Sequence, residues 1–394
     1  MLSQPLDAAR CALPQLGATH ETNGTVMTDI EKVLDQAGVH NPHAREFIQH
    51  WAAITNPARI EVVSAEDDDR LIEESLAAGE IVPAGEDLYY SRSYYKDTAR
   101  TEERTVVATS NPADKGAYNN WRPADEMKPL LTERMRGASA GKTMYVIPYL
   151  MAPWGSPLED FAAGIELTDH RTVALHMIRM ARVGPEYIEG LSHPDRFVRA
   201  VHVTGDLENL GQGTPDDKRY FVTVADERTI LHFGSSYGGN ALLGKIAHGL
   251  RQASYDGWAS GKFLSEQFML IGIRDKETGR KYHICGGFPS ASGKTNLAMM
   301  LAPDALGDRY YVEFFGDDIA WIWVDEESGE LRAMNPEYGV FGVARDTNET
   351  SNPTALEAVA PGTKTLFTNV AYNDLKQEVW WEGRTPHYPE DVAG

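Results

Sequence analysis

Apolar and polar positions in the first part of the chain follow helical spacing, with one short interruption by a strand pattern. Between residues 28 and 55 apolar side chains recur every three or four positions, and Asn56–Pro57 ends the run. Ile60–Val63 predicts a short strand, and Asp67–Ala78 predicts an acidic amphipathic helix. This mixture indicates an α/β protein rather than an all-helical or all-strand one.

Strand patterns become more frequent further along the chain. Thr105–Thr109 is expected to form a strand, and Phe197–Val203 and Tyr220–His232 alternate apolar and polar residues as strands do. Gln267–Ile273 and Lys281–Gly286 predict a hairpin, because the turn-forming residues 276–279 separate them. The second strand of this hairpin is followed directly by a loop of small residues.

The small-residue loop ends in Gly293-Lys294-Thr295 and leads into an expected helix at Asn296–Leu301. Such a loop brings backbone amides close to phosphate oxygens, while the lysine offers a charge and the threonine a hydroxyl for a divalent cation. The strict pattern G-x-x-x-x-G-K-[ST] is not met, since Phe288 stands five residues before Gly293. A purely structural turn is therefore the alternative.

A pair of carboxylates follows the next strand pattern. Tyr310–Phe315 ends in Gly316-Asp317-Asp318, and acidic residues at the end of a neighbouring strand can anchor the cation that accompanies a nucleotide. Together with the small-residue loop, this pair predicts a site for a nucleoside triphosphate.

Two other segments carry possible anion chemistry. The residues from Ser235 to Gly239 form a small-residue loop centred on Tyr237, which could approach an anion or simply cap a helix. Arg100 precedes the strand Thr105–Thr109, and on sequence alone it is best interpreted as a surface arginine paired with a nearby glutamate.

Composition narrows the class of protein. A chain of 394 residues with 42% hydrophobic and 24% charged residues can bury the cores of two domains. The net charge of −21 argues against nucleic-acid or anionic-membrane partners. Two distant cysteines, Cys11 and Cys285, predict a reducing, cytoplasmic setting. No apolar run reaches membrane-spanning length, and residues 1–27 are expected to form a flexible tail.

The motifs taken together resemble GTP-dependent phosphoenolpyruvate carboxykinase in its actinobacterial form. The matching stretches lie between about residues 85 and 383, and they are DTARTEERT, TMYVIPYLMAPWGSPLEDFAAGIELTD, FGSSYGGNALLGK, FPSASGKTNLAMM, FFGDDIAW, NPEYGVFGV, LFTNVAYND and VWWEG. The resemblance implies an α/β, two-lobed fold with mixed sheets. Residues 28–245 would form the substrate-binding N-terminal domain, and residues 246–394 a truncated P-loop nucleotide-binding domain.

The resemblance also implies an activity and a set of site residues. The family converts oxaloacetate and GTP to phosphoenolpyruvate, CO2 and GDP in gluconeogenesis, usually as a monomer. Substrate-binding roles fall on Arg100, Tyr237, Gly238, Gly239 and Ser290, and nucleotide-binding roles on Ala291, Ser292, Gly293, Lys294, Thr295 and Asn296. Catalytic roles fall on Ser292, Lys294 and Lys245, and metal-binding roles on Asp318, Asp317 and Gln267.

Several positions depart from the family pattern. The catalytic Mn2+, which acts beside the Mg2+ that accompanies GTP, is held in the family by a lysine, a histidine and an aspartate. Here Ile246 and Gln267 stand at the first two of these positions, which predicts a weakened metal site and little turnover. The sequence also lacks the family's later segments, so the nucleotide lobe is expected to be incomplete. The alternatives are a catalytically impaired binding module or a gene fragment that retains phosphate or dicarboxylate binding.

Overall fold

A mixed sheet of nine described strands forms the larger part of the protein. The computed structural model describes residues 24–92, 102–116, 120–205, 215–235, 243–244, 246–289 and 292–387. The strands of the large sheet are β1 (Arg59–Val62), β4 (Thr105–Thr109), β5 (Trp121–Pro123), β6 (Thr143–Leu150), β7 (Ala163–Thr168), β8 (Arg182–Val183), β9 (Val198–Val203), β10 (Tyr220–Val224) and β11 (Thr229–Phe233). Their order is β1-β6-β7-β9-β11-β10-β4-β5, and β8 pairs with β6.

The centre of this sheet is buried on both faces. Every residue of β7, and all of β6 after Thr143, is buried. The segments TMYVIPYL and AGIELT are therefore almost continuously apolar instead of alternating. Parallel and antiparallel pairings both occur, because β7 pairs with β9 in parallel and with β6 antiparallel. These pairings confirm the predicted α/β class with a mixed sheet.

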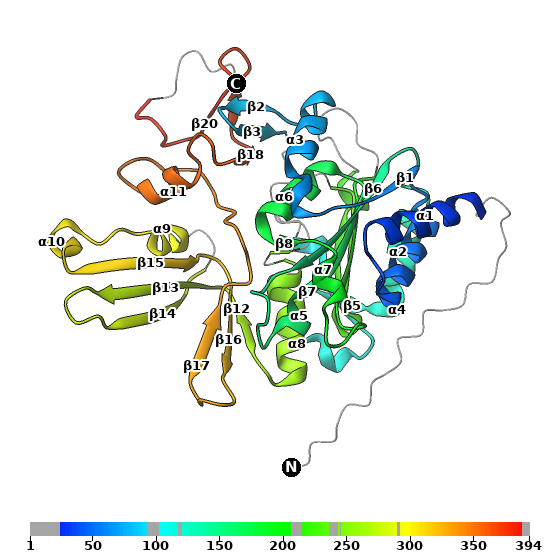
Figure 1. Ribbon diagram of the computed structural model, residues 1–394, viewed down its shortest axis with the longest axis horizontal. Helices are drawn as coiled ribbons and strands as arrows, with labels where there is room; N and C mark the ends of the chain where they lie inside the picture. The colour runs from blue at the N-terminus through cyan, green and yellow to red at the C-terminus, as the bar shows by residue number, and fades with distance from the viewer. Residues whose placement is uncertain are drawn as a thin grey trace.

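The α-helices up to residue 260 lie around the large sheet (Figure 1). They are α1 (Gly24–Gln36), α2 (Pro42–Thr55), α3 (Asp68–Ala77), α4 (Ala124–Met135), α5 (Glu159–Ala162), α6 (Arg171–Met180), α7 (Glu186–Glu189) and α8 (Ala253–Ser260). Of these helices, α1, α4, α6 and α7 contact the strands of the sheet. Helix α4 contacts β4, β5, β10 and β11, whereas α6 and α7 contact β6 and β7.

The single run of helical spacing over residues 28–55 forms two helices instead of one. Gly38 adopts a positive φ of 75°, which favours glycine and ends α1. Asn41 then caps α2, since its side chain accepts hydrogen bonds from the amides of His43 and Ala44, and Pro42 occupies the first helical turn. The prediction of helical structure was correct, but the apolar spacing continues across the break between α1 and α2 and so did not reveal it.

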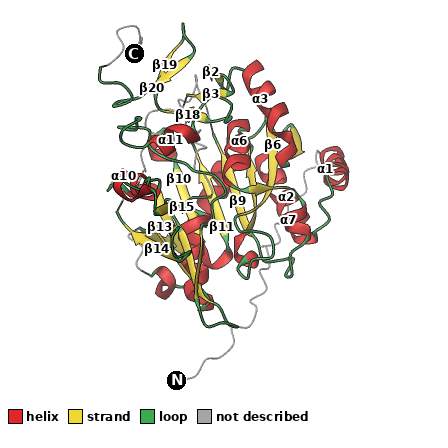
Figure 2. Ribbon diagram, turned by 60° about the vertical axis from the view of Figure 1, so that its left-hand side comes forward, coloured by secondary structure: helices red, strands yellow, loops and turns green. Residues whose placement is uncertain are grey.

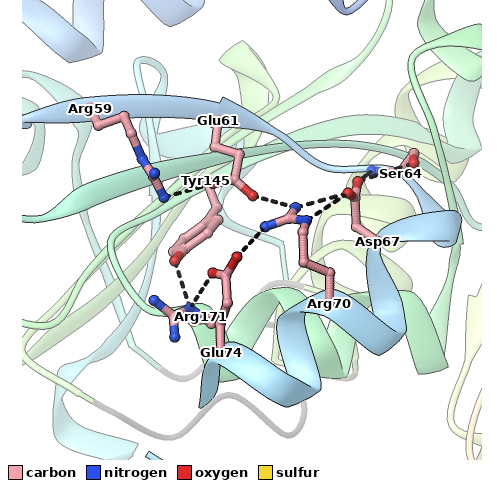
Figure 3. A network of polar contacts seen from close by, with 8 residues as sticks. All are labelled: Arg59, Glu61, Ser64, Asp67, Arg70, Glu74, Tyr145 and Arg171. Atoms are coloured by element: carbon pink, nitrogen blue, oxygen red, sulfur yellow. Dashed lines mark hydrogen bonds and ion pairs between the residues drawn. The ribbon is translucent and has the colours of Figure 1, made fainter. Parts of the chain in front are cut away.

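A polar network holds α3 and α6 against the edge of the large sheet (Figure 3). Arg70 donates to Glu61 of β1 at 2.5 Å and to Asp67 and Glu74 at 2.8 Å each. Arg171, the first residue of α6, donates from Nε to the Tyr145 hydroxyl at 2.9 Å. Because Arg70 is half exposed, each of its ion pairs contributes modestly; together they link α3 to β1, while Arg171 pairs with Glu74 and so links α6 to α3.

Four smaller sheets and three short helices contain the rest of the described chain. Their elements are β2 (Val82–Gly85), β3 (Leu88–Ser91), β12 (Leu264–Glu266), β13 (Phe268–Asp275), β14 (Lys281–Gly287), α9 (Lys294–Ala298), α10 (Asp304–Gly307), β15 (Tyr310–Gly316), β16 (Ala320–Val324), β17 (Leu331–Met334), α11 (Pro353–Ala358), β18 (Leu366–Thr368), β19 (Ala371–Asn373) and β20 (Glu378–Trp380). The sheets are ordered β14-β13-β15, β12-β16-β17, β18-β3-β2 and β19-β20. In Figure 1 the β14-β13-β15 sheet projects to the side opposite α1 and α2.

The predicted hairpin is confirmed, and the strands around it are antiparallel. Strand β13 pairs with β14 from Phe268 to Arg274, and with β15 along its other edge. Strands β12, β16 and β17 are likewise antiparallel to one another. The parallel pairings described for this protein therefore lie in the large sheet and between β3 and β18.

The last described strands return to the N-terminal part of the chain (Figure 2). Strand β18 pairs in parallel with β3, and the ring of Tyr372 stacks on Tyr90 with centroids 5.0 Å apart. Arg179 of α6 donates to the carbonyl oxygen of Lys364 at 2.8 Å. Residues far apart in the sequence thus share one small apolar core that includes Leu88, Tyr90, Phe367 and Trp381. The predicted domain boundary at residue 245 stays a prediction.

Candidate functional site

The small-residue loop lies between β14 and α9, as its sequence predicts. Gly293 has a φ of 89°, a backbone conformation that residues with a Cβ rarely adopt. It directly precedes α9. The helix is shorter than the predicted Asn296–Leu301 run, since it begins at Lys294 and ends at Ala298. Ala298 and Met299 are buried, but Leu297 and Leu301 are exposed, so only part of this segment has an apolar face that stabilises a helix.

The lysine and threonine of the loop each contact one of the two predicted carboxylates. The Nζ atom of Lys294 donates to Asp318 Oδ1 at 2.7 Å and to the Asp318 carbonyl oxygen at 2.9 Å. The hydroxyl of Thr295 donates to Asp317 Oδ2 at 2.6 Å. Sequence reasoning therefore identified four side chains that the fold brings together from positions more than 20 residues apart.

One strand separates the loop from the carboxylates. The sheet order β14-β13-β15 places β13 between the strand that enters the loop and the strand that ends at Asp317. The prediction of a directly neighbouring strand was therefore wrong, because the hairpin folds β14 onto the far edge of β13. Helix α9 contacts β13, and its first two residues reach the acidic pair.

Gln267, the residue before β13, completes this cluster. Its carbonyl oxygen accepts from Lys294 Nζ at 3.4 Å, and its Nε2 donates to Asp318 Oδ1 at 3.3 Å. The predicted position of Gln267 beside Asp318 is therefore observed, although its role toward a metal stays a prediction. An amide can present oxygen or nitrogen by rotation, so this side chain is able to face either a carboxylate or a cation.

The site is partly withdrawn from water. Lys294 and Asp317 are only 7% and 4% exposed. Burial raises the pKa of the Asp317 carboxyl, and the negative charge of Asp318 acts in the same direction, whereas the hydrogen bond from Thr295 and the charge of Lys294 oppose it. In such surroundings a charged ligand interacts more strongly than it would at the open surface.

Ile246 occupies a different environment from the one that a metal ligand needs. Its side chain is half buried and packs against the main hydrophobic core. A hydrocarbon side chain offers no donor atom to a cation, so this position adds packing but no coordination.

A π-helical turn follows Ile246 and is fixed to the large sheet by His248. The Nε2 atom of His248 lies 2.7 Å from the carbonyl oxygen of Phe161, and Nδ1 lies 2.8 Å from the Tyr149 hydroxyl. A carbonyl can only accept, so Nε2 carries the proton and Nδ1 accepts from Tyr149. Burial lowers the pKa of His248 to about 4, which agrees with a neutral ring.

The next residue, Gly249, links this turn to β12 and β16, the strands that lie next to Gln267 and Asp318 in the chain. Its carbonyl oxygen accepts from Trp321 Nε1 at 2.7 Å and from Ser265 Oγ at 2.8 Å. Ser265 lies two residues before Gln267, and Trp321 lies three residues after Asp318. The Gly249 carbonyl therefore ties the turn to β12 and β16, which also pair directly with each other. Sequence reasoning missed this junction, since a glycine carbonyl leaves no pattern in the side chains.

Asn352 forms a further link that the sequence did not predict. Its Nδ2 donates to Asn296 Oδ1 at 3.0 Å, and its own Oδ1 accepts from the Ala355 amide at the start of α11. The predicted nucleotide-binding residue Asn296 is thereby tied to the segment that continues into β18. The only signal in the sequence was the helix-capping pattern Asn352-Pro353.

Other predicted residues have fewer described contacts or none. The exposed Ser292 donates from Oγ to the Pro289 carbonyl oxygen at 2.6 Å. The positions that lie outside the described residues are Arg100, Tyr237, Gly238, Gly239, Lys245, Ser290 and Ala291. Across the described ranges, no group of three or more His, Cys, Asp or Glu side chains is placed to hold a metal ion. Within the same ranges, no helix has both the length and the apolar character needed to cross a membrane.

The hairpin, the small-residue loop and the paired carboxylates define a P-loop protein. Family models agree with this class and refine it: the phosphoenolpyruvate carboxykinase N-terminal domain matches residues 46–258, and the phosphoenolpyruvate carboxykinase C-terminal P-loop domain matches residues 263–394. The chain belongs to the phosphoenolpyruvate carboxykinase family.

Curated relatives support this membership. The chain is 39% identical over 341 residues to phosphoenolpyruvate carboxykinase [GTP] of Corynebacterium efficiens, covering 84% of this chain and 53% of the relative. It is 38% identical to the enzymes of that name from Renibacterium salmoninarum and Neocallimastix frontalis, covering 92% and 90% of this chain and 60% and 58% of the relatives. The chain thus spans little more than half the length of these relatives.

Proposed function

We propose that this chain serves the phosphoenolpyruvate carboxykinase (GTP) reaction, in which oxaloacetate and GTP give phosphoenolpyruvate, CO2 and GDP. The observation that carries the proposal is the joint contact of Lys294 with Asp318 and of Thr295 with Asp317. These contacts gather a phosphate-binding cation, a hydroxyl and two carboxylates at the end of one sheet. Phosphoryl transfer needs such an arrangement, because its catalysis consists mainly of positioning and charge stabilisation.

The donor atoms of the site fit a hard divalent cation. Asp317, Asp318 and Thr295 all present oxygen, and the amide of Gln267 can present oxygen as well. Mg2+ and Mn2+ bind oxygen ligands, and Mg2+ is commonly held by one or two carboxylates together with phosphate and water. The proposed ligands are therefore Asp318 and Asp317, with Thr295 near the phosphates. A bound cation would add positive charge beside the transferred phosphoryl group.

Other residues of the chain are proposed to bind the phosphates and the substrate. Lys294 would bind the outer phosphates, and the Gly293 backbone would allow the loop to approach them closely. Arg100 is proposed to hold the substrate carboxylate with its planar guanidinium group. Tyr237, Gly238, Gly239 and Ser290 would line the same pocket, and Lys245 would add charge near the reacting groups. These roles follow from family membership and the matching motifs.

Product formation tests this proposal directly. Incubation with oxaloacetate, GTP and Mn2+, followed by 31P NMR, should give phosphoenolpyruvate and GDP in equal amounts. Asp318→Ala should reduce the rate to less than about a tenth, since an ion-pairing carboxylate is lost, while Asp308→Ala, an exposed acid of the same lobe, should not. Absence of product above the protein-free background would contradict the proposal.

A second candidate function is ligand binding without turnover, and the packing of Ile246 favours it. That side chain contributes to the hydrophobic core at a position where the family has a metal-ligating lysine. A chain that binds GTP but forms no phosphoenolpyruvate would match this candidate. In either case the proposed partners are small molecules, the proposed location is the cytoplasm, and the proposed state is a monomer.

A further inference from the structure

The Nζ atom of Lys294 points toward Asp318 and lies 2.7 Å from its Oδ1. We propose that Lys294 acts as an internal counter-ion of Asp318, so that a bound phosphate must draw it away before a divalent cation can bind tightly. The phosphate in question is that of the nucleotide, so this part rests on the proposed function. The competition between Lys294 and a cation for Asp318 does not.

The hydrogen bonds of Lys294 all lead toward the acidic side of the site. Its Nζ contacts Asp318 Oδ1, the Asp318 carbonyl oxygen and the Gln267 carbonyl oxygen. An ammonium group has three protons, and these three acceptors can use all of them. Lys294 cannot therefore bind a phosphate in this conformation without giving up at least one of these contacts.

The same contacts oppose a cation at Asp318. Lys294 Nζ lies 2.7 Å from Oδ1, so a divalent ion bound to that carboxylate would lie within a few ångströms of an ammonium charge. The side chains of Lys294 and Asp318 are only 7% and 17% exposed, so water screens the repulsion poorly. The ion pair thus occupies the carboxylate that the cation needs.

Phosphate binding would relieve this competition. A triphosphate attracts the ammonium group toward the loop, and its departure leaves the negative charge of Asp318 available to a cation. Because linkage is reciprocal, a ligand that removes Lys294 from Asp318 increases cation affinity, and the cation increases affinity for that ligand by the same factor. The site would therefore fill cooperatively, with little cation bound before the phosphate arrives.

Removal of the lysine charge tests the inference without any nucleotide. Lys294→Met keeps the length of the side chain, and free Mn2+ can be measured by electron paramagnetic resonance during a titration. We expect the variant to bind Mn2+ at least about tenfold more tightly than the unaltered protein, equivalent to about 1.4 kcal/mol. Lys281→Met is the matched control, since Lys281 is exposed and pairs with Glu313 on the same sheet. It should leave Mn2+ affinity unchanged.

The outcomes separate this inference from the proposed function. The gain should disappear in the double variant Lys294→Met/Asp318→Asn, which ties it to that carboxylate. Unchanged or weaker Mn2+ binding by Lys294→Met would overturn the counter-ion role, even if GTP binds. Tighter Mn2+ binding together with no GTP binding by the unaltered protein would support the counter-ion role and count against the proposed function. Lys294→Gln, with its fold checked by circular dichroism, repeats the test if the methionine variant is unstable.

Discussion

At the scale of single residues, the protein contains pairs of opposite charges that are largely buried. Lys294 and Asp318 form one such pair within the candidate site. Arg228 and Asp256 form another, with Arg228 Nε 3.0 Å from Asp256 Oδ1. Burying charged groups is unfavourable unless a partner compensates, so each pair places a constraint on the conformations around it.

Asp256 should make stability depend on pH. Burial raises its pKa to about 6, although Arg228 opposes this shift. Because the folded-state pKa exceeds that of an unfolded aspartate, the contribution is fully present below about pH 3.8 and is lost as pH rises through about 6. Relative to Asp256→Asn, the unaltered protein should lose about 2 kcal/mol of unfolding free energy between pH 4 and pH 7. Urea denaturation followed by tryptophan fluorescence measures this difference, and a difference that stays constant with pH would contradict it.

At the scale of secondary-structure elements, the Gly249 carbonyl is the connection that matters most for the site. It accepts hydrogen bonds from Ser265 of β12 and from Trp321 of β16. Gln267 follows β12 in the chain, and Asp318 precedes β16. Trp321 and Ser265 are both buried, so their hydrogen bonds have no competition from bulk water. The junction therefore ties the turn to both ends of the acidic cluster, while the direct pairing of β12 with β16 sets the spacing of the two strands.

Gly249→Ala should disturb that junction. An added Cβ would lie 2.7 Å from the Leu243 carbonyl oxygen and 3.0 Å from Ile319 Cδ1, so backbone atoms must shift. We expect a loss of about 1–3 kcal/mol of unfolding free energy, measured by urea denaturation. Gly342→Ala is the control, because a Cβ there would meet no atom within 4 Å. Equal stability of the two variants would show that the turn tolerates the extra atom.

The sequence predicted local elements better than the contacts between them. Strand Thr105–Thr109 and the hairpin before the small-residue loop were correct, since β-branched residues and turn residues are local signals in the sequence. The break at Gly38 and Asn41 was missed, because the helical periodicity continues on both sides of it. The position of β13 between the loop and Asp317 was also missed, as strand order depends on long-range pairing.

For the candidate site, residue types were easier to predict than their partners. Lys294, Thr295, Asp317 and Asp318 were identified because glycine-rich loops and paired acids leave a clear pattern in the sequence. The contacts of Gly249 and Asn352 could not be predicted, since Gly249 takes part only through its backbone carbonyl and Asn352 joins segments 56 residues apart.

At the scale of the whole molecule, the part of the chain after residue 260 is joined to the part before it at two places. The Gly249 junction connects the turn after the large sheet to β12 and β16, and β18 returns to pair with β3. Asn352 lies in the segment that leads to β18, and its hydrogen bond to Asn296 connects that segment to α9. The helix after the small-residue loop is therefore tied to the segment that returns to β3, in a sheet separate from the large one.

Equilibrium binding of GTP in the presence of Mg2+ tests the central claim most directly, namely that Lys294 and its neighbours form a nucleotide site. By isothermal titration calorimetry the unaltered protein should bind one GTP per chain. Lys294→Met should bind it at least about tenfold more weakly, as expected for loss of a charged hydrogen bond, while Lys281→Met should bind it normally. No binding by the unaltered protein, or equal binding by Lys294→Met, would contradict the claim.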